Sequence, residues 1–429
     1  MDQTTVGISD ISLYLPKNRI LLDTILAKRT EENPEIHTRL SRAIQSTDQV
    51  SIRFPSLWED AAVLAGNSAL RLMNQQNGDL GILRYFVVGT ETTVDLSKSM
   101  SAYVQGMLSK SPYPIPSKIS SFQVQHACAG ATLGMLSVAG LLAAAGKPGE
   151  TGLVIASDIA RYDAPSTAEI TQGAGSAAML VEVNPKLVSF NLETQGFSSN
   201  DVDDFFRPLW STTAKVKGRY SVQCYNEALD EAFKDFCERS NRSEKEVLEN
   251  TDYFVFHVPF AKMANTAVRR LLSNHLGIFA QDAENFLSPR GFFDALQVTG
   301  DVGNIYTGAI YLNLMATLYQ QYQIHGDKIV GKKILFSSYG SGNTMVVFDG
   351  EVMPNAPDII KQWDLGAYVS SYQESDFKEY LSWIDRSYTF ETFEKEKEAI
   401  LAGAVPGQFY LESIREDGYR NYQYKDIIK

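Results

Sequence analysis

Cysteine and positive charge are both scarce in this 429-residue sequence. The three cysteines, Cys128, Cys224 and Cys237, are too few and odd in number for a disulfide framework, so we expect a reducing, cytoplasmic compartment. The net charge of −12 argues against nucleic acid as a partner, because phosphate backbones are held by clustered Lys and Arg. An anionic ligand would therefore need a local basic patch.

Long hydrophobic runs are also missing. The most apolar helix-like run, Leu136 to Ala145, is far shorter than the roughly 20 residues that span a bilayer. The amino-terminal segment MDQTTVGISD has no basic leader followed by an apolar stretch. We therefore expect neither membrane insertion nor export. The length and the 44% hydrophobic content predict a globular protein with one large core or two fused ones.

Two halves of the sequence echo each other. The strand-like run RYFVVGTE (Arg84 to Glu91) ends in an acid, and the similar run YFVFH (Tyr253 to His257) ends in an imidazole. Cys128 opens a long apolar helix-like stretch to Ala145, and Asn304 opens a comparable one to about Tyr319. The pairing predicts that chemically active side chains stand at strand ends and helix starts in both halves.

A further echo comes from two pairs of buried strands, each pair joined by a glycine turn. GLVIASD (Gly152 to Asp158) precedes GAGSAAMLV, and KILFSSY (Lys333 to Tyr339) precedes GSGNTMVV. An internal duplication of mixed strands and helices explains these likenesses. We expect a first half over residues 1–190 with Glu91 and Cys128, and a second over 191–429 with His257 and Asn304. The last 75 or so residues form a charged, aromatic appendage.

Four residues are candidates for chemistry. A thiol at a helix start has its pKa lowered by the positive end of the helix, which makes Cys128 a better nucleophile. Burial among apolar neighbours favours neutral imidazole at His257, and the setting of Glu91 raises the pKa of a carboxylate toward a general acid or base role. Asn304 would hold a carbonyl or a water. Taken singly, each also has a plainer reading: a small buried residue, a core histidine, a solvated glutamate and a helix cap.

Taken together, these segments resemble the 3-hydroxy-3-methylglutaryl-CoA synthase family over nearly the whole chain. The resemblance implies an α/β thiolase fold, whose duplicated halves give five layers in the order α-β-α-β-α, and a homodimer. The matching motifs, in family order, are VGISDISLYLPK, GTETTVD, HACAGAT, LVIASDIARYD, TQGAGSAAML, DDFFRP, FHVPFAKM, VGNIYTG and SYGSG, with FYLESI as a closing strand.

The resemblance also implies a reaction and its catalytic residues. Acetyl-CoA would acylate Cys128, and Glu91 would remove a proton from the methyl group of acetyl-S-Cys128. The enolate would attack the ketone of acetoacetyl-CoA, polarised by His257, and Glu91 would return its proton to the alkoxide. Water would then cleave the thioester to give 3-hydroxy-3-methylglutaryl-CoA. The family implies no metal and no cofactor, since coenzyme A thioesters are the substrates.

Further residues are assigned to substrate binding by the same resemblance. Asn304 and the backbone of Ser341 would hold the acyl carbonyls. Lys262 is the best match for a contact to the CoA phosphates. Here the chain departs from the family, because Ala264-Asn265-Thr266 stands where many members have lysines. The other candidates are Tyr162, Thr171 and Phe206 for the acyl pocket, Lys215, Lys217 and Arg219 as additional cations, and Arg269 and Arg270 one turn after Thr266. Apart from the resemblance, the scarcity of glycine and the mixed charge of residues 25 to 55 predict a helical cover near the tunnel.

Alternative functions stay open at this point. The carrier-dependent branch of the family performs polyketide β-branching on acyl carrier proteins, with unchanged chemistry and a basic rim for an acidic helical partner. A ketoacyl synthase would share the fold but needs no carboxylate base, so Glu91 argues against it. A degenerate homologue that only binds acyl groups would not need the full catalytic set. The pathway, whether mevalonate and isoprenoid biosynthesis, leucine-related metabolism or polyketide assembly, does not follow from the sequence.

Overall fold

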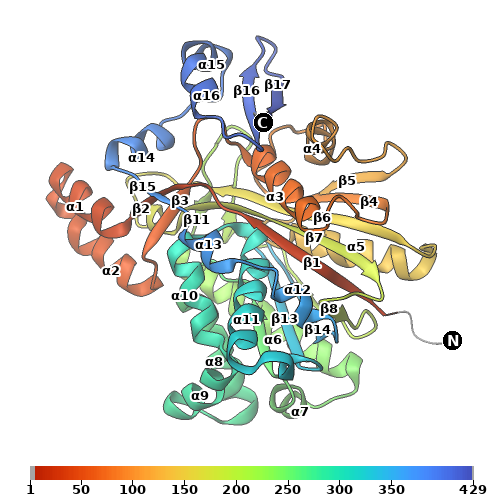
Figure 1. Ribbon diagram of the computed structural model, residues 1–429. Helices are drawn as coiled ribbons and strands as arrows, with labels where there is room; N and C mark the ends of the chain where they lie inside the picture. Colours follow the sequence, from red (N-terminus) through yellow and green to blue (C-terminus); the bar gives the residue numbers. More distant parts are fainter. Residues whose placement is uncertain (1–4, 428–429) are drawn as a thin grey trace.

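The computed structural model describes residues 5–427 and shows a mixed α/β protein built around one large sheet (Figure 1). The expectation about an export leader falls partly on residues 1–4, which lie outside the described residues. The sheet has ten strands in the order β12-β13-β14-β8-β1-β7-β6-β4-β5, with β9 paired to β14. These strands are β1 (Val6–Tyr14), β4 (Ile82–Gly89), β5 (Ser120–Val124), β6 (Glu150–Ala160), β7 (Gly173–Val183), β8 (Val188–Phe190), β9 (Gly196–Ser199), β12 (Tyr253–Phe256), β13 (Lys333–Gly340) and β14 (Thr344–Val352).

The short strand β8 joins two parts of this sheet, because it pairs with both β1 and β14. In the first part β4 runs parallel to β5 and β6, and in the second part β12 runs parallel to β13. The strand predicted at the start of the chain is β1, which pairs antiparallel with β7 in the middle of the sheet. Parallel strands in each part bring the carboxyl ends of β4, β6 and β12 to positions where loops can meet.

Helices cover both parts of the sheet and fill the space between them. One buried hydrophobic cluster lies around α5 and α11, a second joins α3 and α4 to the first part, and a third joins α6 and α8 to the second part. This confirms the predicted layering in the order α-β-α-β-α. The helices of these layers and their neighbours are α3 (Ala61–Gln75), α4 (Met100–Leu108), α5 (Gly130–Ala145), α6 (Gly218–Ser240), α7 (Glu244–Glu249), α8 (Ala261–Leu276), α9 (Ala280–Leu287), α10 (Phe292–Val302), α11 (Ala309–His325), α12 (Ala356–Ile360) and α13 (Leu365–Ser370).

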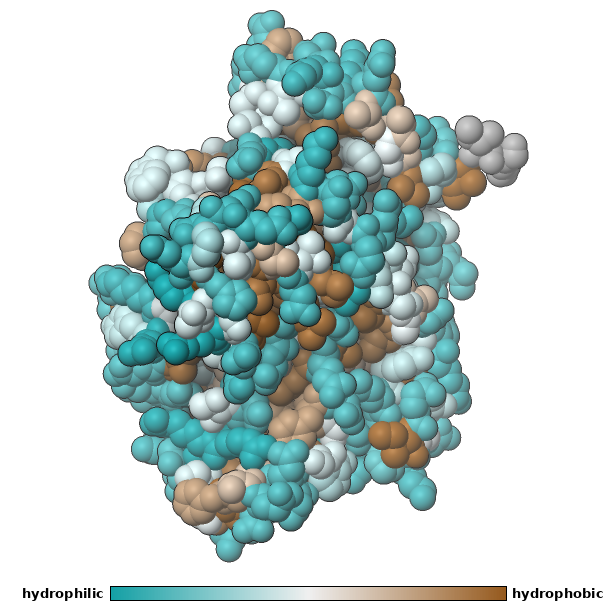
Figure 2. All heavy atoms as spheres, turned by 90° about the vertical axis from the view of Figure 1, so that its left-hand side faces the viewer, coloured by the Kyte–Doolittle hydropathy of each residue, from teal (hydrophilic) through white to brown (hydrophobic). Residues whose placement is uncertain are grey.

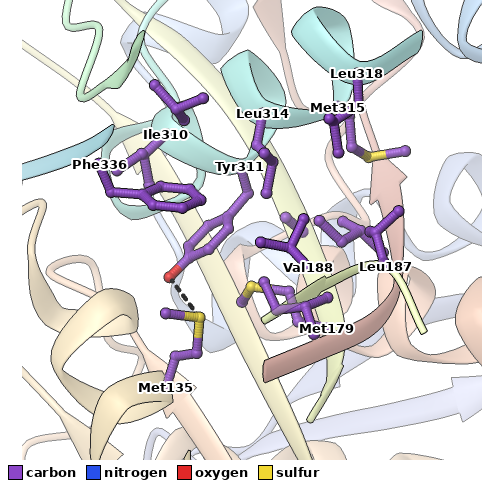
Figure 3. Packing of buried hydrophobic residues seen from close by; sticks show 14 of the residues in the cluster. Met135, Met179, Leu187, Val188, Ile310, Tyr311, Leu314, Met315, Leu318 and Phe336 are labelled. Atoms are coloured by element: carbon purple, nitrogen blue, oxygen red, sulfur yellow. Dashed lines mark hydrogen bonds between the residues drawn. The ribbon is translucent and has the colours of Figure 1, made fainter. Parts of the chain in front are cut away.

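The central layer holds the two helices predicted to follow Cys128 and Asn304. Tyr311 on α11 points toward α5, where its hydroxyl lies 3.6 Å from the sulfur of Met135 (Figure 3). The same hydroxyl lies 3.1 Å from the hydroxyl of Thr132. Within residues 5–427, one segment, Ala127–Ala145, is apolar and long enough to span a bilayer, but 61% of it is buried. Since α5 packs against the sheet and α11, it is a core helix of this fold.

The connection from β6 to β7 is longer than the sequence predicts. Twelve residues, 161–172, separate the two strands and include a short 3₁₀ turn, η2 (Glu169–Thr171). The second pair, β13 and β14, is joined by the predicted tight turn over residues 341–343. A single glycine turn is therefore wrong for the first pair. The longer loop carries Tyr162 and Thr171, two of the residues predicted to line the acyl pocket.

Residues 25 to 55 do form a helical cover, although its last helix ends at Thr47 and a strand follows. Its helix α1 is fixed to the β6–β7 loop by the ion pair between Arg29 and the buried Glu169, at 2.7 Å. Tyr380 and Trp383 of α14 pack into the same hydrophobic cluster as Leu40 of α2. The cover consists of β2 (Asn18–Leu21), α1 (Leu22–Glu32), η1 (Pro34–Ile36), α2 (His37–Thr47) and β3 (Ser51–Phe54), with β15 (Gln373–Glu374) and α14 (Phe377–Ile384) beside it.

The carboxyl-terminal appendage packs on the first half of the chain, although it follows the second half in sequence. Asn67 of α3 exchanges two hydrogen bonds with the backbone of Phe409, at 3.1 and 2.7 Å. Arg420 pairs with the buried carboxylate of Asp60 at 2.6 Å. FYLESI is a strand, as predicted, but it belongs to a separate hairpin. The appendage ends in α15 (Phe390–Lys395), α16 (Lys397–Gly403), β16 (Phe409–Ile414) and β17 (Arg420–Tyr424).

Candidate active site

Cys128 and Glu91 meet where the loops after β4 and before α5 come together. The thiol of Cys128 donates a hydrogen bond to Glu91 Oε1 at 3.1 Å, and both side chains are buried. Small residues make this approach possible, because a Cβ on Gly89 would lie 2.2 Å from the backbone nitrogen of Ala131. The run of small residues after Cys128 therefore lets α5 begin directly against β4. Ala127, with a φ of 41°, adopts a left-handed conformation that sets the direction of the next residue.

The protonation states of this pair differ from the sequence prediction at one residue. Burial raises the pKa of Glu91 to about 7, as expected for a carboxyl group poised near neutrality. The pKa of Cys128 was predicted to be lowered by the helix start, and this is wrong. Burial and the neighbouring carboxylates of Glu91 and Asp158 raise the pKa of the thiol well above its ordinary value. The resting thiol is therefore neutral and needs a base, and Glu91 is in contact with it.

Asp158 is a buried residue of this site to which the sequence analysis assigned no role. One oxygen of its buried carboxylate accepts hydrogen bonds from the backbone N–H of Glu91, at 2.9 Å, and from Thr90 and Thr92. The other accepts from the backbone N–H of Thr307, at 3.1 Å, and from its hydroxyl. Asp158 thus ties the Glu91 loop to the second half of the chain. An acid within the largely apolar run LVIASDIA was the available signal.

His257 and Asn304 bring the second half to the same place. His257 follows β12, is 1% exposed, and its backbone N–H donates to Ser337 O at 2.8 Å. Burial lowers the pKa of its imidazole to about 3, so the ring is neutral, as the sequence predicts. Asn304 is buried, and its side-chain oxygen accepts from the N–H of Tyr306 at 2.8 Å. Its amide N–H₂ group is free of that bond and can donate.

A cavity of about 960 Å³ is lined by Cys128, His257 and Asn304, and we call it the Cys128 cavity. Its wall includes most of the residues predicted from the sequence. The turn between β13 and β14 comes close to the Cys128 segment, because a Cβ on Gly340 would lie 2.3 Å from His126 O. The predicted residues that line the Cys128 cavity are Cys128, Tyr162, Thr171, His257, Lys262, Asn304 and Ser341, with Lys215 and Arg219 at its edge.

The prediction for Phe206 is wrong, and its neighbour takes the predicted place. Phe205 lines the Cys128 cavity and makes edge-to-face contacts with Tyr162 and Tyr306, at ring distances of 6.3 and 5.8 Å. Phe206 is 47% exposed and lines a different cavity. Because successive residues of a strand point to opposite sides, the two-residue strand β10 (Phe205–Phe206) can turn only one of them inward. Its partner strand is β11 (Lys215–Val216).

Basic residues at and near the edge of the Cys128 cavity differ in whether an acidic side chain pairs with them. Lys262 donates to Gln45 O at 3.0 Å and pairs with Asp48 at 3.5 Å, and Lys215 pairs with Asp163 at 2.6 Å. Within residues 5–427, Arg219 makes no ion pair. Arg39 and Arg42 are exposed on α2, one turn before the cavity-lining residues Ala43 and Ser46. Figure 2 shows the side of the molecule on which α1 and α2 lie in Figure 1, with apolar residues gathered between largely hydrophilic surroundings.

The remaining cations suggested by the sequence are held elsewhere. Arg270 pairs with Asp230 at 2.6 Å, Arg269 pairs with Glu284, and Lys217 pairs with Asp203. None of these three is part of the described wall of the Cys128 cavity. The structure therefore places Lys215, Arg219 and Lys262 in the wall of the Cys128 cavity, and Arg39 and Arg42 on the exposed surface of the neighbouring helix α2.

A second cavity of about 510 Å³, which we call the Arg207 cavity, reaches Glu91 from another side. Arg207 donates a hydrogen bond to the backbone oxygen of Glu91, and its positive charge lowers the pKa of the Glu91 carboxyl group against the effect of burial. The Nε and Nη2 groups of Arg207 are buried and have no acceptor among the described residues. The motif DDFFRP contained Arg207, but only its contact with Glu91 gives it a role.

Replacing Arg207 by methionine should shift the pH dependence of the reaction. The guanidinium lowers the pKa of Glu91, so its loss raises that pKa, and Glu91 stays protonated up to a higher pH. Because a base must be ionised, the acid limb of kcat/KM, expected near pH 7 from the pKa of Glu91, moves to higher pH. Arg207→Lys keeps the charge and should leave the limb nearly in place. An unmoved limb in Arg207→Met would contradict this electrostatic role.

Models of one protein family cover almost the whole chain. The model for the N-terminal part of hydroxymethylglutaryl-coenzyme A synthase matches residues 3–186, and the model for the C-terminal part matches residues 188–290 and 291–425. A hydroxymethylglutaryl-CoA synthase of Enterococcus faecalis is 26% identical over 378 residues, which are 88% of this chain and 90% of that protein. These matches extend across both halves.

Solved structures give the same result for the fold. MvaS in complex with 3-hydroxy-3-methylglutaryl coenzyme A has 28% identity and a TM-score of 0.82, over 99% of this chain and 100% of that one. The HMG synthase of the curacin biosynthetic pathway, in complex with holo donor-ACP, has 23% identity and a TM-score of 0.81, over 98% and 100%. The fold is therefore the one expected, and it occurs in proteins bound to either kind of acyl carrier.

Proposed function

Because the chain belongs to the hydroxymethylglutaryl-coenzyme A synthase family and so carries out an HMG synthase-like condensation, we propose that it joins acetyl-CoA and acetoacetyl-CoA into 3-hydroxy-3-methylglutaryl-CoA. The observation that carries this proposal is the contact at 3.1 Å between the Cys128 thiol and Glu91 beside a cavity lined by His257 and Asn304. A nucleophile, a base and neutral donors are the groups that this condensation needs.

The first step is acetylation of Cys128. The neutral thiol gives its proton to Glu91, whose pKa of about 7 makes it half ionised at neutral pH. The thiolate attacks the carbonyl of acetyl-CoA, and the departing CoA thiolate takes up a proton. Glu91 is ionised again once that proton has left, so it is ready to act on the acetyl group now held at 128.

Condensation uses the same carboxylate a second time. Glu91 removes a proton from the acetyl methyl group, and the enolate attacks the ketone carbon of acetoacetyl-CoA. His257 is neutral, so it donates a hydrogen bond to the ketone oxygen without giving up a full proton. The side-chain amide of Asn304 and the backbone of Ser341 stabilise the other acyl oxygens. Glu91 returns its proton to the alkoxide, and hydrolysis of the thioester releases the product from Cys128.

The mouth of the Cys128 cavity supports CoA thioesters as substrates. Arg219 lines it, and Arg39 and Arg42 are exposed on α2 one turn before the lining residues Ala43 and Ser46, on a protein whose net charge is −12. Guanidinium groups bind phosphates through paired hydrogen bonds, so this local patch suits the phosphates of CoA. Lys262 adds to it when it leaves Asp48, an exposed partner at 3.5 Å that holds it weakly.

The same mouth also supports a second candidate, an HMG synthase that takes acyl groups from carrier proteins. Lys262 is held by Asp48, and the next turn of α8 offers Ala264, Asn265 and Thr266 in place of lysines. Fewer cations near the phosphates weaken the preference for free CoA, while the exposed arginines of α2 would suit an acidic helix. The chemistry at Cys128 is common to both candidates.

Acetyl transfer from each carrier separates the two. We expect acetyl-CoA to acetylate Cys128 with an appreciable kcat/KM, and acetyl-pantetheine to react with a higher KM because it lacks the 3′-phospho-ADP group. In Arg219→Gln, KM should rise for acetyl-CoA and stay unchanged for acetyl-pantetheine. Transfer from an acetylated carrier protein but not from acetyl-CoA would reject the CoA-dependent reaction and leave the carrier-dependent one.

A further inference from the structure

We propose that the Arg207 cavity supplies the water that hydrolyses the thioester on Cys128 while the Cys128 cavity is filled by the product's CoA arm. This inference rests on the proposed function, because it concerns the last step of that reaction. In this proposal water reaches the active site through the Arg207 cavity. The acyl thioesters reach it through the Cys128 cavity.

The two cavities lie on different sides of the catalytic pair. Cys128 lines the larger cavity and Glu91 lines the smaller one, while the hydrogen bond of 3.1 Å between them crosses the boundary. Phe205 and Ser341 line both cavities and so form part of the wall that separates them. A water molecule in the Arg207 cavity can therefore contact the base without passing the acyl group.

The larger cavity is a poor route for water during turnover. Tyr162, Phe205 and Tyr306 form an aromatic cluster with Cys128, so much of the wall beside the thiol is apolar ring surface. After condensation the HMG group is attached to Cys128 by one carboxyl group and to CoA by the other. The CoA arm then occupies the route from the Cys128 cavity to the mouth, at the moment when hydrolysis must occur.

The smaller cavity has a larger polar share in its wall than the Cys128 cavity, and it has unused hydrogen-bonding groups. Arg207 Nε and Nη2 and Arg161 Nε are buried without an acceptor among the described residues. Leaving such donors dry is costly, so water is their natural partner. The cavity of about 510 Å³ has room for several molecules, since one water takes up roughly 30 Å³ in the liquid. Thr92, Thr93 and Gln125 add polar groups along the wall that leads to Glu91.

The step balances with the groups present. Glu91 is a carboxylate after it has returned its proton to the alkoxide, so it can take a proton from a water molecule in the Arg207 cavity. The resulting hydroxide adds to the thioester carbonyl carbon of HMG-S-Cys128. The tetrahedral intermediate then breaks its C–S bond, and the Cys128 thiolate takes the proton back from Glu91. One water is consumed, one carboxylic acid forms, and the thiol and carboxylate are restored.

Blocking the smaller cavity tests the route. Val94 and Thr212 line the Arg207 cavity and do not line the Cys128 cavity, so Val94→Phe and Thr212→Trp narrow the former alone. In both variants we expect kcat to fall about tenfold, because slower entry of water makes hydrolysis the rate-limiting step. Acid quenching during turnover should trap most of the enzyme as HMG-S-Cys128, while acetyl transfer from acetyl-CoA keeps its wild-type rate.

Two controls make the outcome specific. Val222→Phe narrows the Cys128 cavity instead, and should raise KM for the thioesters without accumulating HMG-S-Cys128. In the second control, acetyl-labelled Val94→Phe is separated from CoA and hydrolysis of acetyl-S-Cys128 is followed. The acetyl label should be lost at nearly the wild-type rate, because water can then enter through the empty Cys128 cavity. The inference would be overturned if Val94→Phe and Thr212→Trp accumulated no more HMG-S-Cys128 than the wild-type enzyme. An equal decrease in the rates of acetyl transfer and of hydrolysis would also overturn it. If the wild-type enzyme takes no acetyl label at all, the proposed function itself has failed.

Discussion

Glu91→Gln should abolish condensation while Cys128 can still be acetylated completely. The amide cannot take a proton from the acetyl methyl group, and loss of a general base costs roughly 10²–10⁴-fold in rate. Acetylation should slow but reach completion, because the thiol loses the carboxylate that raises its pKa and can pass its proton to solvent. Radiolabelled acetyl-CoA, with and without acetoacetyl-CoA, measures both steps on the same sample.

The comparison with Glu91→Asp sharpens this prediction. Aspartate keeps the charge but is shorter by one methylene group, so it moves the carboxylate away from a thiol that lies 3.1 Å away in the native protein. We expect Glu91→Asp to recover part of the activity at high pH. Condensation at an unaltered rate in Glu91→Gln would remove Glu91 from the reaction, and with it the main difference from a decarboxylating ketoacyl synthase.

Cys128→Ala should leave a folded protein with no covalent intermediate and no turnover. Removing the nucleophile of an enzyme that acts through an acyl intermediate lowers kcat on the order of 10⁴–10⁶-fold. The thiol is buried, but it is small and its hydrogen bond to Glu91 is a weak one, so the fold should persist. Mass spectrometry after incubation with acetyl-CoA should find no added acetyl group on the variant.

The other cysteines provide a matched control for this experiment. Cys237 is also a free, buried thiol, but it lies on α6 and lines neither of the two cavities. Cys237→Ala should therefore be acetylated on Cys128 and turn over normally. If Cys128→Ala kept measurable condensation, the reaction would not pass through an acetyl-enzyme on this residue. The same experiment separates an active enzyme from a homologue that only binds acyl groups.

Most of the fold followed from local patterns in the sequence. The run RYFVVGTE predicts a strand that ends beside Glu91, and β4 ends at Gly89. The run YFVFH predicts the same for His257, and β12 ends at Phe256. Such predictions succeed because the alternation or run of apolar residues in a buried strand is a local property of the chain.

The sequence was less successful where neighbours in space decide. Phe205 and Phe206 are adjacent and chemically identical, and only the pairing of β10 with β11 determines which of them faces Cys128. The appendage could not be placed either, because its packing on α3 depends on contacts such as that of Asn67 with Phe409, residues that are 342 positions apart. Arg207 gained a role from its contact with Glu91, and Arg161 from the cavity that both arginines line.

The sequence alone determined which chemical groups this protein has and in which motifs they occur: a thiol before an apolar helix, an acid and an imidazole after buried strands, and an asparagine before a second helix. The tertiary structure decided their protonation states and their access to solvent. It raises the pKa of the Cys128 thiol instead of lowering it, and it places Glu91 in the wall of the Arg207 cavity, in contact with the thiol that lines the Cys128 cavity. The physical reason is that a pKa depends on burial and on charges within a few ångströms, and residues that are far apart along the chain supply both.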